Sequence, residues 1–163
     1  MRIVILVLGA LVALVLLVIA IGYALPVAHV ATREARFAAP PERVFGVLKD
    51  VEKFPTWRSD VKGVEVLATV PALRWRERGD NDITFDMETV EAPRRIVTRI
   101  ADRSLPFGGS WTYELAPQDG GTRLAITENG EVYNPLFRFM SRFVFGHTAT
   151  LERYLADLER HLR

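Results

Sequence analysis

The chain contains no cysteine among its 163 residues. This excludes disulfide bonds, zinc–thiolate sites and cysteine nucleophiles, but it does not indicate the compartment. An excess of charge is also missing, because 21 Lys and Arg are balanced by 20 Asp and Glu, for a net charge of +1. Nucleic-acid binding needs a basic face or stripe, so we predict no nucleic-acid partner.

Motifs for metals and cofactors are scarce as well. The three histidines, His29, His147 and His161, lie far apart, and no pair has the spacing of two ligands on one helix. Asp80 and Asp82 resemble half of a calcium loop, but the glycine and distal glutamate of such a loop do not follow. We therefore predict no metal site and no cofactor.

Apolar sequence is abundant at the N-terminus. The run from Ile3 to Leu25 contains no charged residue. At about 1.5 Å per residue, a helix of this length matches a hydrocarbon core about 30 Å thick. The alternative is a cleaved signal peptide, but its apolar region is normally only about 7–15 residues long. The sequence favours a retained single-pass transmembrane anchor over residues 1–26, followed by one domain over residues 27–163. Basic residues flank the run on both sides, so the side of the membrane on which the domain lies is left open.

The remaining residues carry strand patterns separated by turn signals. Apolar and polar side chains alternate in residues 73–78, 83–88, 111–115 and 124–128. Further strands are predicted at residues 29–39, 61–67 and 96–101, short helices after Pro41 and Pro55, and a loop at residues 105–109. Short turns between successive strands favour antiparallel pairing. The sequence predicts an α+β fold, a curved antiparallel sheet of about seven strands wrapped on a long C-terminal helix, with a ligand pocket between sheet and helix.

Residues 134–163 predict that long helix. Asn134 and Pro135 have the chemistry of a helix start. Apolar residues then recur at steps of three and four, at Leu136, Met140, Phe143, Leu151, Leu155, Leu158 and Leu162. The polar residues opposite the second half of this stripe, including Asp157, are expected to face water. The first half carries further apolar side chains, so we predict that it forms a pocket lid or lies near the bilayer, with Gly146 as the joint between the halves.

Several segments resemble the SRPBCC superfamily, which includes the START domains, the birch-pollen-allergen-like proteins and the polyketide cyclase/dehydrase-like proteins. Residues 37–57 resemble its first strand, its Pro-x-x-x-Val-Phe helix and its Pro-x-Trp element. Residues 108–115, 120–131 and 151–158 resemble its later strands and its C-terminal helix. The resemblance covers nearly all of the chain after the membrane segment and implies a helix-grip fold. It does not select one activity, because the superfamily includes both lipid carriers and cyclases.

The candidate site residues lie on the inward side of the predicted sheet and on the helix stripe. Glu128 would orient a polar ligand group or act as a general acid or base, with a strand end that turns it to water as an equally favoured alternative. His147 is the second acid/base candidate, although a core or rim histidine is favoured for it. For Glu77, which charged residues flank, exposure to water is favoured. The predicted pocket residues are Trp75, Phe85, Trp111, Tyr113, Ile126, Glu128, Met140, Phe143, His147 and Leu151.

Two functions fit these features. The first is a membrane-tethered module that binds a hydrophobic small molecule, such as a lipid, an isoprenoid or a polyketide-like compound. The second is a polyketide cyclase/dehydratase-like enzyme in which Glu128, His147 or Tyr113 transfers protons. Binding is preferred because the spacing of these residues does not identify an acid/base pair. A scaffold whose pocket is filled by its own side chains is a third alternative.

Overall fold

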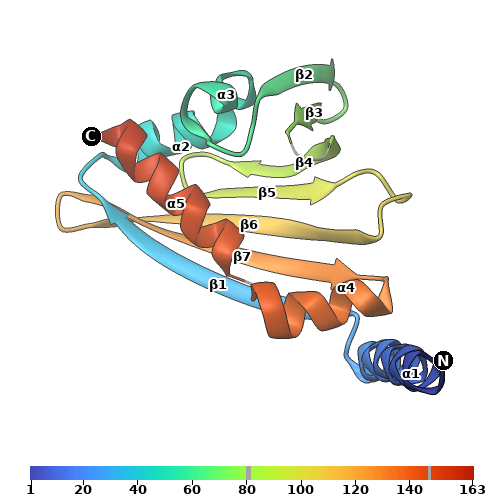
Figure 1. The fold of residues 1–163 in the computed structure, drawn as a ribbon. Coiled ribbons are helices and arrows are strands. Elements are labelled where there is room, and N and C mark those ends of the chain that lie inside the picture. The colour runs from blue at the N-terminus through green and yellow to red at the C-terminus, as the bar shows by residue number, and fades with distance from the viewer. Residues whose placement is uncertain (80–81, 147) are drawn as a thin grey trace.

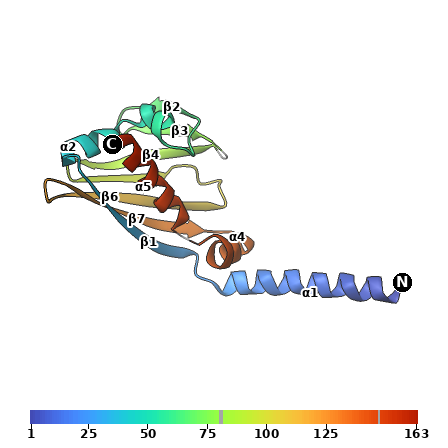
Figure 2. The same ribbon diagram turned by 60° about the vertical axis from the view of Figure 1, so that its left-hand side comes forward.

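The computed structural model describes residues 1–79, 82–146 and 148–163, without the side chain of Phe145. A long helix precedes the folded domain. This helix, α1 (Arg2–Ala24), is by length and composition able to cross a membrane, and its apolar side chains are exposed. Figure 2 shows α1 extending away from the domain, with its C-terminal end beside α4 (Pro135–Met140).

Within the described residues, seven antiparallel strands form a single sheet. They are β1 (Ala28–Phe37), β2 (Gly63–Ala68), β3 (Arg74–Arg78), β4 (Ile83–Glu91), β5 (Arg95–Ile100), β6 (Phe107–Gln118) and β7 (Gly121–Val132). Their spatial order is β1-β7-β6-β5-β4-β3-β2, so the first strand pairs with the last and every other pair is consecutive in the chain (Figure 1). The predicted α+β class and the predicted antiparallel sheet are confirmed.

The predicted loop at residues 105–109 was wrong at its C-terminal end. β6 already begins at Phe107, and Gly109 pairs with Gly130 of β7. Gly109 has a φ of +144°, and a Cβ at this position would lie 2.6 Å from the carbonyl oxygen of Asn129. The glycines of this segment therefore permit a close approach of two strands, which the sequence pattern does not distinguish from a turn.

Helical segments connect β1 to β2, and others follow β7. α2 (Pro41–Lys49), the 3₁₀ turn η1 (Val51–Lys53) and α3 (Phe54–Trp57) follow β1. After β7 come α4, the π-helical turn η2 (Ser141–Phe145) and α5 (Ala149–Leu162). The C-terminal helix is thus interrupted, and Gly146 between η2 and α5 has a φ of +73° that favours glycine. This confirms the predicted joint at Gly146.

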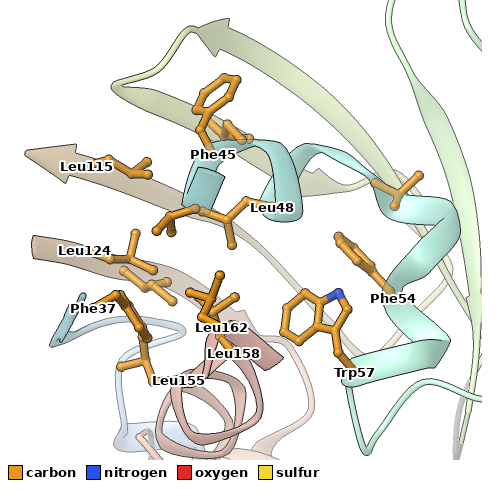
Figure 3. Packing of buried hydrophobic residues seen from close by; sticks show 14 of the residues in the cluster. Phe37, Phe45, Leu48, Phe54, Trp57, Leu115, Leu124, Leu155, Leu158 and Leu162 are labelled. Carbon is orange, nitrogen blue, oxygen red and sulfur yellow. The ribbon is translucent and has the colours of Figure 1, made fainter. Parts of the chain in front are cut away.

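The hydrophobic core lies at one end of α5. Figure 3 shows Leu155, Leu158 and Leu162 of α5 close to Phe37, Leu115 and Leu124 of the sheet and to Leu48 of α2. Leu124 and Leu158 are fully buried. α5 crosses the sheet diagonally, and its C-terminal end lies near α2 (Figure 1). The C-terminal half of α5 therefore packs against the part of the core near α2, and the N-terminal half lies over another part of the sheet.

Asp157 was expected to face water on the polar side of α5, but the structure buries it. Its side chain is only 2% exposed. Asp157 Oδ2 accepts hydrogen bonds from the backbone N–H and the hydroxyl of Ser59, each at 2.7 Å, and Arg160 pairs with the other oxygen. The carboxylate thus connects α5 to the segment after α3, because two donors distant in sequence satisfy it in a buried position.

Candidate functional site

A cavity of about 680 Å³ lies between the sheet and the N-terminal half of α5. Its walls come from the inward faces of β3 to β7, from α3 and its following residues, and from α4, η2 and α5. The predicted pocket residues that line it are Trp75, Phe85, Trp111, Tyr113, Ile126, Glu128, Met140 and Leu151. Phe143 is 60% exposed and does not belong to the described lining residues, and His147 lies outside the described part of the chain.

Aromatic rings form one wall of the cavity. Trp75 of β3 stacks on Phe85 of β4 with ring centroids 5.5 Å apart, and Phe85 meets Trp111 of β6 edge-on at 5.9 Å. Trp75 and Phe85 are directly opposite each other in the β3–β4 register. Flat, weakly polar rings of this kind favour contact with an apolar ligand.

Glu128 projects from β7 into this cavity. Its side chain is 12% exposed, which excludes the alternative of a strand end turned to water. Trp111 Nε1 donates a hydrogen bond to Glu128 Oε2 at 3.0 Å, and His29 Nε2 lies 3.2 Å from Glu128 Oε1. The carboxylate is therefore held by two ring nitrogens from neighbouring strands, which reduces the cost of its burial.

Gly130 provides the space for the His29 imidazole. His29 of β1 lies opposite Gly130 of β7 in the antiparallel register. A Cβ at Gly130 would collide with the imidazole ring, so any larger residue here would displace His29 from Glu128. The carboxylate–imidazole pair thus depends on a glycine in the middle of a strand, where glycine is otherwise unfavourable.

Glu77 does not face water, contrary to the prediction. It is 7% exposed and lines the cavity from β3. Arg58 Nη1 donates to Glu77 Oε1 at 2.9 Å, and Trp75 Nε1 donates to the same oxygen at 3.0 Å. Burial raises the pKa of Glu77, and the positive charge of Arg58 only partly offsets this rise.

Arg58 joins two carboxylates at this wall. Besides Glu77, it binds Asp60, whose Oδ2 is 2.7 Å from Arg58 Nη2. Its guanidinium also lies over the rings of Phe54 and Tyr154, with distances of 5.1 and 5.2 Å to the ring centroids. Burial opposes the charged form of Asp60, but the hydrogen bond and charge of Arg58 outweigh it and lower the pKa of Asp60. The arginine thus remains charged within an otherwise aromatic environment.

His29 and Arg58 line the cavity but were not predicted as cavity residues. His29 carried a usable signal, because it shares the inward alternation of β1 with Ala31 and Phe37, both of which are buried. Arg58 carried a weaker one, since its partner Glu77 is 19 residues away along the chain. Tyr113 is half-buried in the cavity wall, and burial raises its pKa to about 12, so its hydroxyl keeps its proton near neutral pH.

The helical side of the cavity comes partly from the segment before α5. Phe137 and Met140 of α4 and Ser141 of η2 line the cavity together with Gly146. The segment predicted to form a lid therefore contributes one wall. Chemically, the site offers a large apolar volume with two pairs of polar side chains, Glu128 with His29 and Glu77 with Arg58.

Solved structures share this architecture. A START superfamily protein from Mycobacterium smegmatis aligns with a TM-score of 0.67 at 19% identity, covering 82% of this chain and 97% of that chain. A protein from Thermus thermophilus aligns with a TM-score of 0.70 at 24% identity, covering 82% and 97%. The Zhui aromatase/cyclase from Streptomyces sp. R1128 aligns with a TM-score of 0.64 at 20% identity, covering 83% and 96%. At these identities the likeness shows the fold alone.

A search of curated proteins finds no match. The family model described as polyketide cyclase / dehydrase and lipid transport matches residues 28–163, which include the whole sheet and all the helices after α1. This match confirms the resemblance to the polyketide cyclase/dehydrase-like group. The chain belongs to the polyketide cyclase / dehydrase and lipid transport family.

Proposed function

We propose that this protein is a membrane-tethered module that holds a hydrophobic small molecule, such as a lipid, an isoprenoid or a polyketide-like compound, between its sheet and α5. The observation that carries the proposal is the cavity of about 680 Å³, which falls in the range of about 300–1,000 Å³ typical of small-molecule sites. Its Trp75, Phe85 and Trp111 wall suits an apolar ligand body. Glu128 and His29 supply an acceptor and an imidazole for one polar group of that ligand.

Native mass spectrometry of the full chain, extracted in detergent, tests the binding function. We expect a reproducible co-purified small molecule. Ile100→Trp introduces an indole on the cavity side of β5 and should lower the occupied fraction at least several-fold by filling the volume. Val97→Trp, on the opposite face of the same strand, is the matched control and should retain the ligand. A chain that carries no ligand, and whose purified structure shows the cavity packed shut, would contradict the proposal.

The membrane tether has its own measurement. α1 has the length and apolar composition of a membrane-spanning helix. Full-length protein should therefore stay in the membrane pellet after an alkaline carbonate wash, as a bilayer-spanning segment does. Release into the supernatant would contradict the tether while leaving the ligand proposal intact.

A second candidate function is a cyclase/dehydratase-like enzyme in the same cavity. It is favoured by the Glu128–His29 pair, since a carboxylate beside an imidazole is a common general acid/base arrangement. Glu128→Gln keeps the shape and a hydrogen-bond acceptor but removes the basic carboxylate. If this variant binds an identified substrate normally and loses its turnover, the enzyme is supported. If turnover is never found or survives the change, binding alone stands.

A further inference from the structure

The α4–η2 segment carries apolar side chains at the cavity and at the surface. Phe137 and Met140 belong to the cavity wall. An open face remains, because Leu136 and Phe137 are 44% and 47% exposed, and Phe143 and Val144 are 60% and 57% exposed. Large apolar side chains gathered on one exposed segment indicate a contact surface, whereas single exposed ones do not.

The helix α4, which carries part of this open face, adjoins the end of α1. Gly22 is buried against the backbone of Pro135, which occupies the space that a Cβ on Gly22 would need. Arg138 Nη1 donates a hydrogen bond to the carbonyl oxygen of Leu25 at 2.8 Å, which satisfies one of the unpaired carbonyls after the last turn of α1. The guanidinium also lies 6.0 Å from the ring centroid of Tyr23. The close contact and the hydrogen bond hold α4 against the point at which α1 leaves the domain.

The surroundings of the open face favour a lipid interface as its occupant. Figure 2 shows α4 beside the C-terminal end of α1, the helix suited to cross a membrane, and both α1 and α4–η2 carry exposed apolar side chains. Arg142 of η2, which precedes Phe143 in the chain, is also exposed and supplies a basic group of the kind that pairs with lipid phosphates. Apolar side chains combined with a basic group are typical of segments that lie in the headgroup region.

We propose that the exposed face of α4–η2, made by Leu136, Phe137, Phe143 and Val144, is a membrane-contact surface seated at the headgroup–acyl boundary. Because Phe137 borders both this face and the cavity, a hydrophobic ligand passes between bilayer and cavity along α4–η2 with little exposure to water. This inference rests on the proposed function, since it takes α1 as the tether. It adds the surface that meets the lipid and the route of the ligand.

The absence of cysteine allows a direct test by single-thiol labelling. Full-length Val144→Cys and Phe143→Cys, each labelled with an environment-sensitive fluorophore, are reconstituted into phosphatidylcholine vesicles with or without nitroxide-labelled lipid. Val70→Cys is the matched control, because Val70 is 81% exposed in the connection after β2, at the opposite edge of the sheet from β1. We expect quenching of about twofold or more at positions 143 and 144, as for a probe in the interface, and little at position 70.

A second pair of variants tests the contact with α1. Gly22→Leu removes the close approach to Pro135, whereas Gly9→Leu places the same side chain where nothing lies within 4 Å. The first should lower the quenching of the probe at position 144, and the second should leave it unchanged. Both variants should stay in the carbonate-washed pellet, because neither changes the apolar character of α1.

The outcomes separate this inference from the proposed function. Probes at positions 143 and 144 that are as unquenched and as water-exposed as the probe at position 70 would overturn the membrane-contact surface. A probe shielded from water but unquenched by nitroxide lipid would also overturn it, because a protein would then cover the face. In both cases the pellet assay and the co-purified ligand still report on the tether and on binding. Loss of either of these would count against the proposed function itself.

Discussion

The two helical segments at the C-terminus contain similar apolar residues but use them differently. In α5, Leu151, Leu155, Leu158 and Leu162 are all buried against the sheet and the short helices. In α4–η2, Leu136, Phe137, Phe143 and Val144 are all more than 40% exposed. The residues of α5 stabilise the fold, whereas those of α4–η2 form a cavity wall and an open surface. Apolar periodicity therefore indicates a face that needs a partner, without identifying that partner.

Polar contacts divide the two segments in the same way. α5 is joined to the domain by the Asp157 hydrogen bonds to Ser59 and by the ion pair of Glu152 with Arg33 of β1, at 2.9 Å. Arg138 of α4 instead donates to the backbone carbonyl oxygens of Leu25 and Tyr133. α5 is therefore held to the sheet and to the segment after α3, whereas the polar contacts of α4 go to the end of α1 and to the residues just before α4.

The largest expected difference is in the free energy of unfolding after truncation of a side chain. Leu158→Ala should lower it by about 2–5 kcal/mol, because Leu158 is fully buried and its loss leaves a cavity in the core. Val144→Ala should change it by less than about 0.5 kcal/mol, because the side chain is exposed. Denaturant unfolding of both full-length variants in the same detergent measures the difference. Equal losses would abolish the distinction between α5 and α4–η2.

A smaller effect is expected at the polar contact of α5. Asp157→Ala removes the acceptor of two hydrogen bonds from Ser59 and should cost about 2 kcal/mol. Glu159→Ala is the matched control, because its carboxylate is exposed and pairs only with Arg163 one turn away among the described residues. Such a pair contributes about 0.5 kcal/mol or less. Similar unfolding midpoints for the two variants would show that Asp157 does not hold α5 to the domain.

Most of the fold could be predicted because its signals are local. The strand alternation of residues 73–78 and 83–88 and the proline at the start of α2 each determine a short segment. The sheet order then follows from antiparallel neighbours, with the pairing of β1 and β7 as the main non-local step. The loop that was predicted around Gly108 failed because glycine permits both turns and close strand contact.

The two polar pairs of the cavity were harder to predict because each joins residues far apart in sequence. Alternation indicated that Glu128 could face inward, but the approach of His29 across 99 residues depends on the β1–β7 register and on Gly130. Glu77 was assigned to solvent because flanking arginines suggested an exposed strand, whereas Arg58 satisfies it from another element. The local pattern of charges does not determine which carboxylates a fold buries.

The smallest expected effect is at the joint between the two helical segments. Gly146→Ala introduces a Cβ at a φ of +73° and should cost about 1 kcal/mol. The strain should affect the junction between η2 and α5, so the difference in amide-exchange protection between α5 and α4–η2 should change. Gly120→Ala is the control, because Gly120 has a similar φ of +79° in the β6–β7 turn and should lower stability without altering that difference. In the unmodified chain, α5 should exchange more slowly than α4–η2, since its packing on the core allows opening only with much of the domain. Amide-exchange protection that is equally high on both sides of Gly146 would mean that the two segments open together. The distinction between α5 as a core helix and α4–η2 as a separate surface segment, with Gly146 as the joint, would then be wrong.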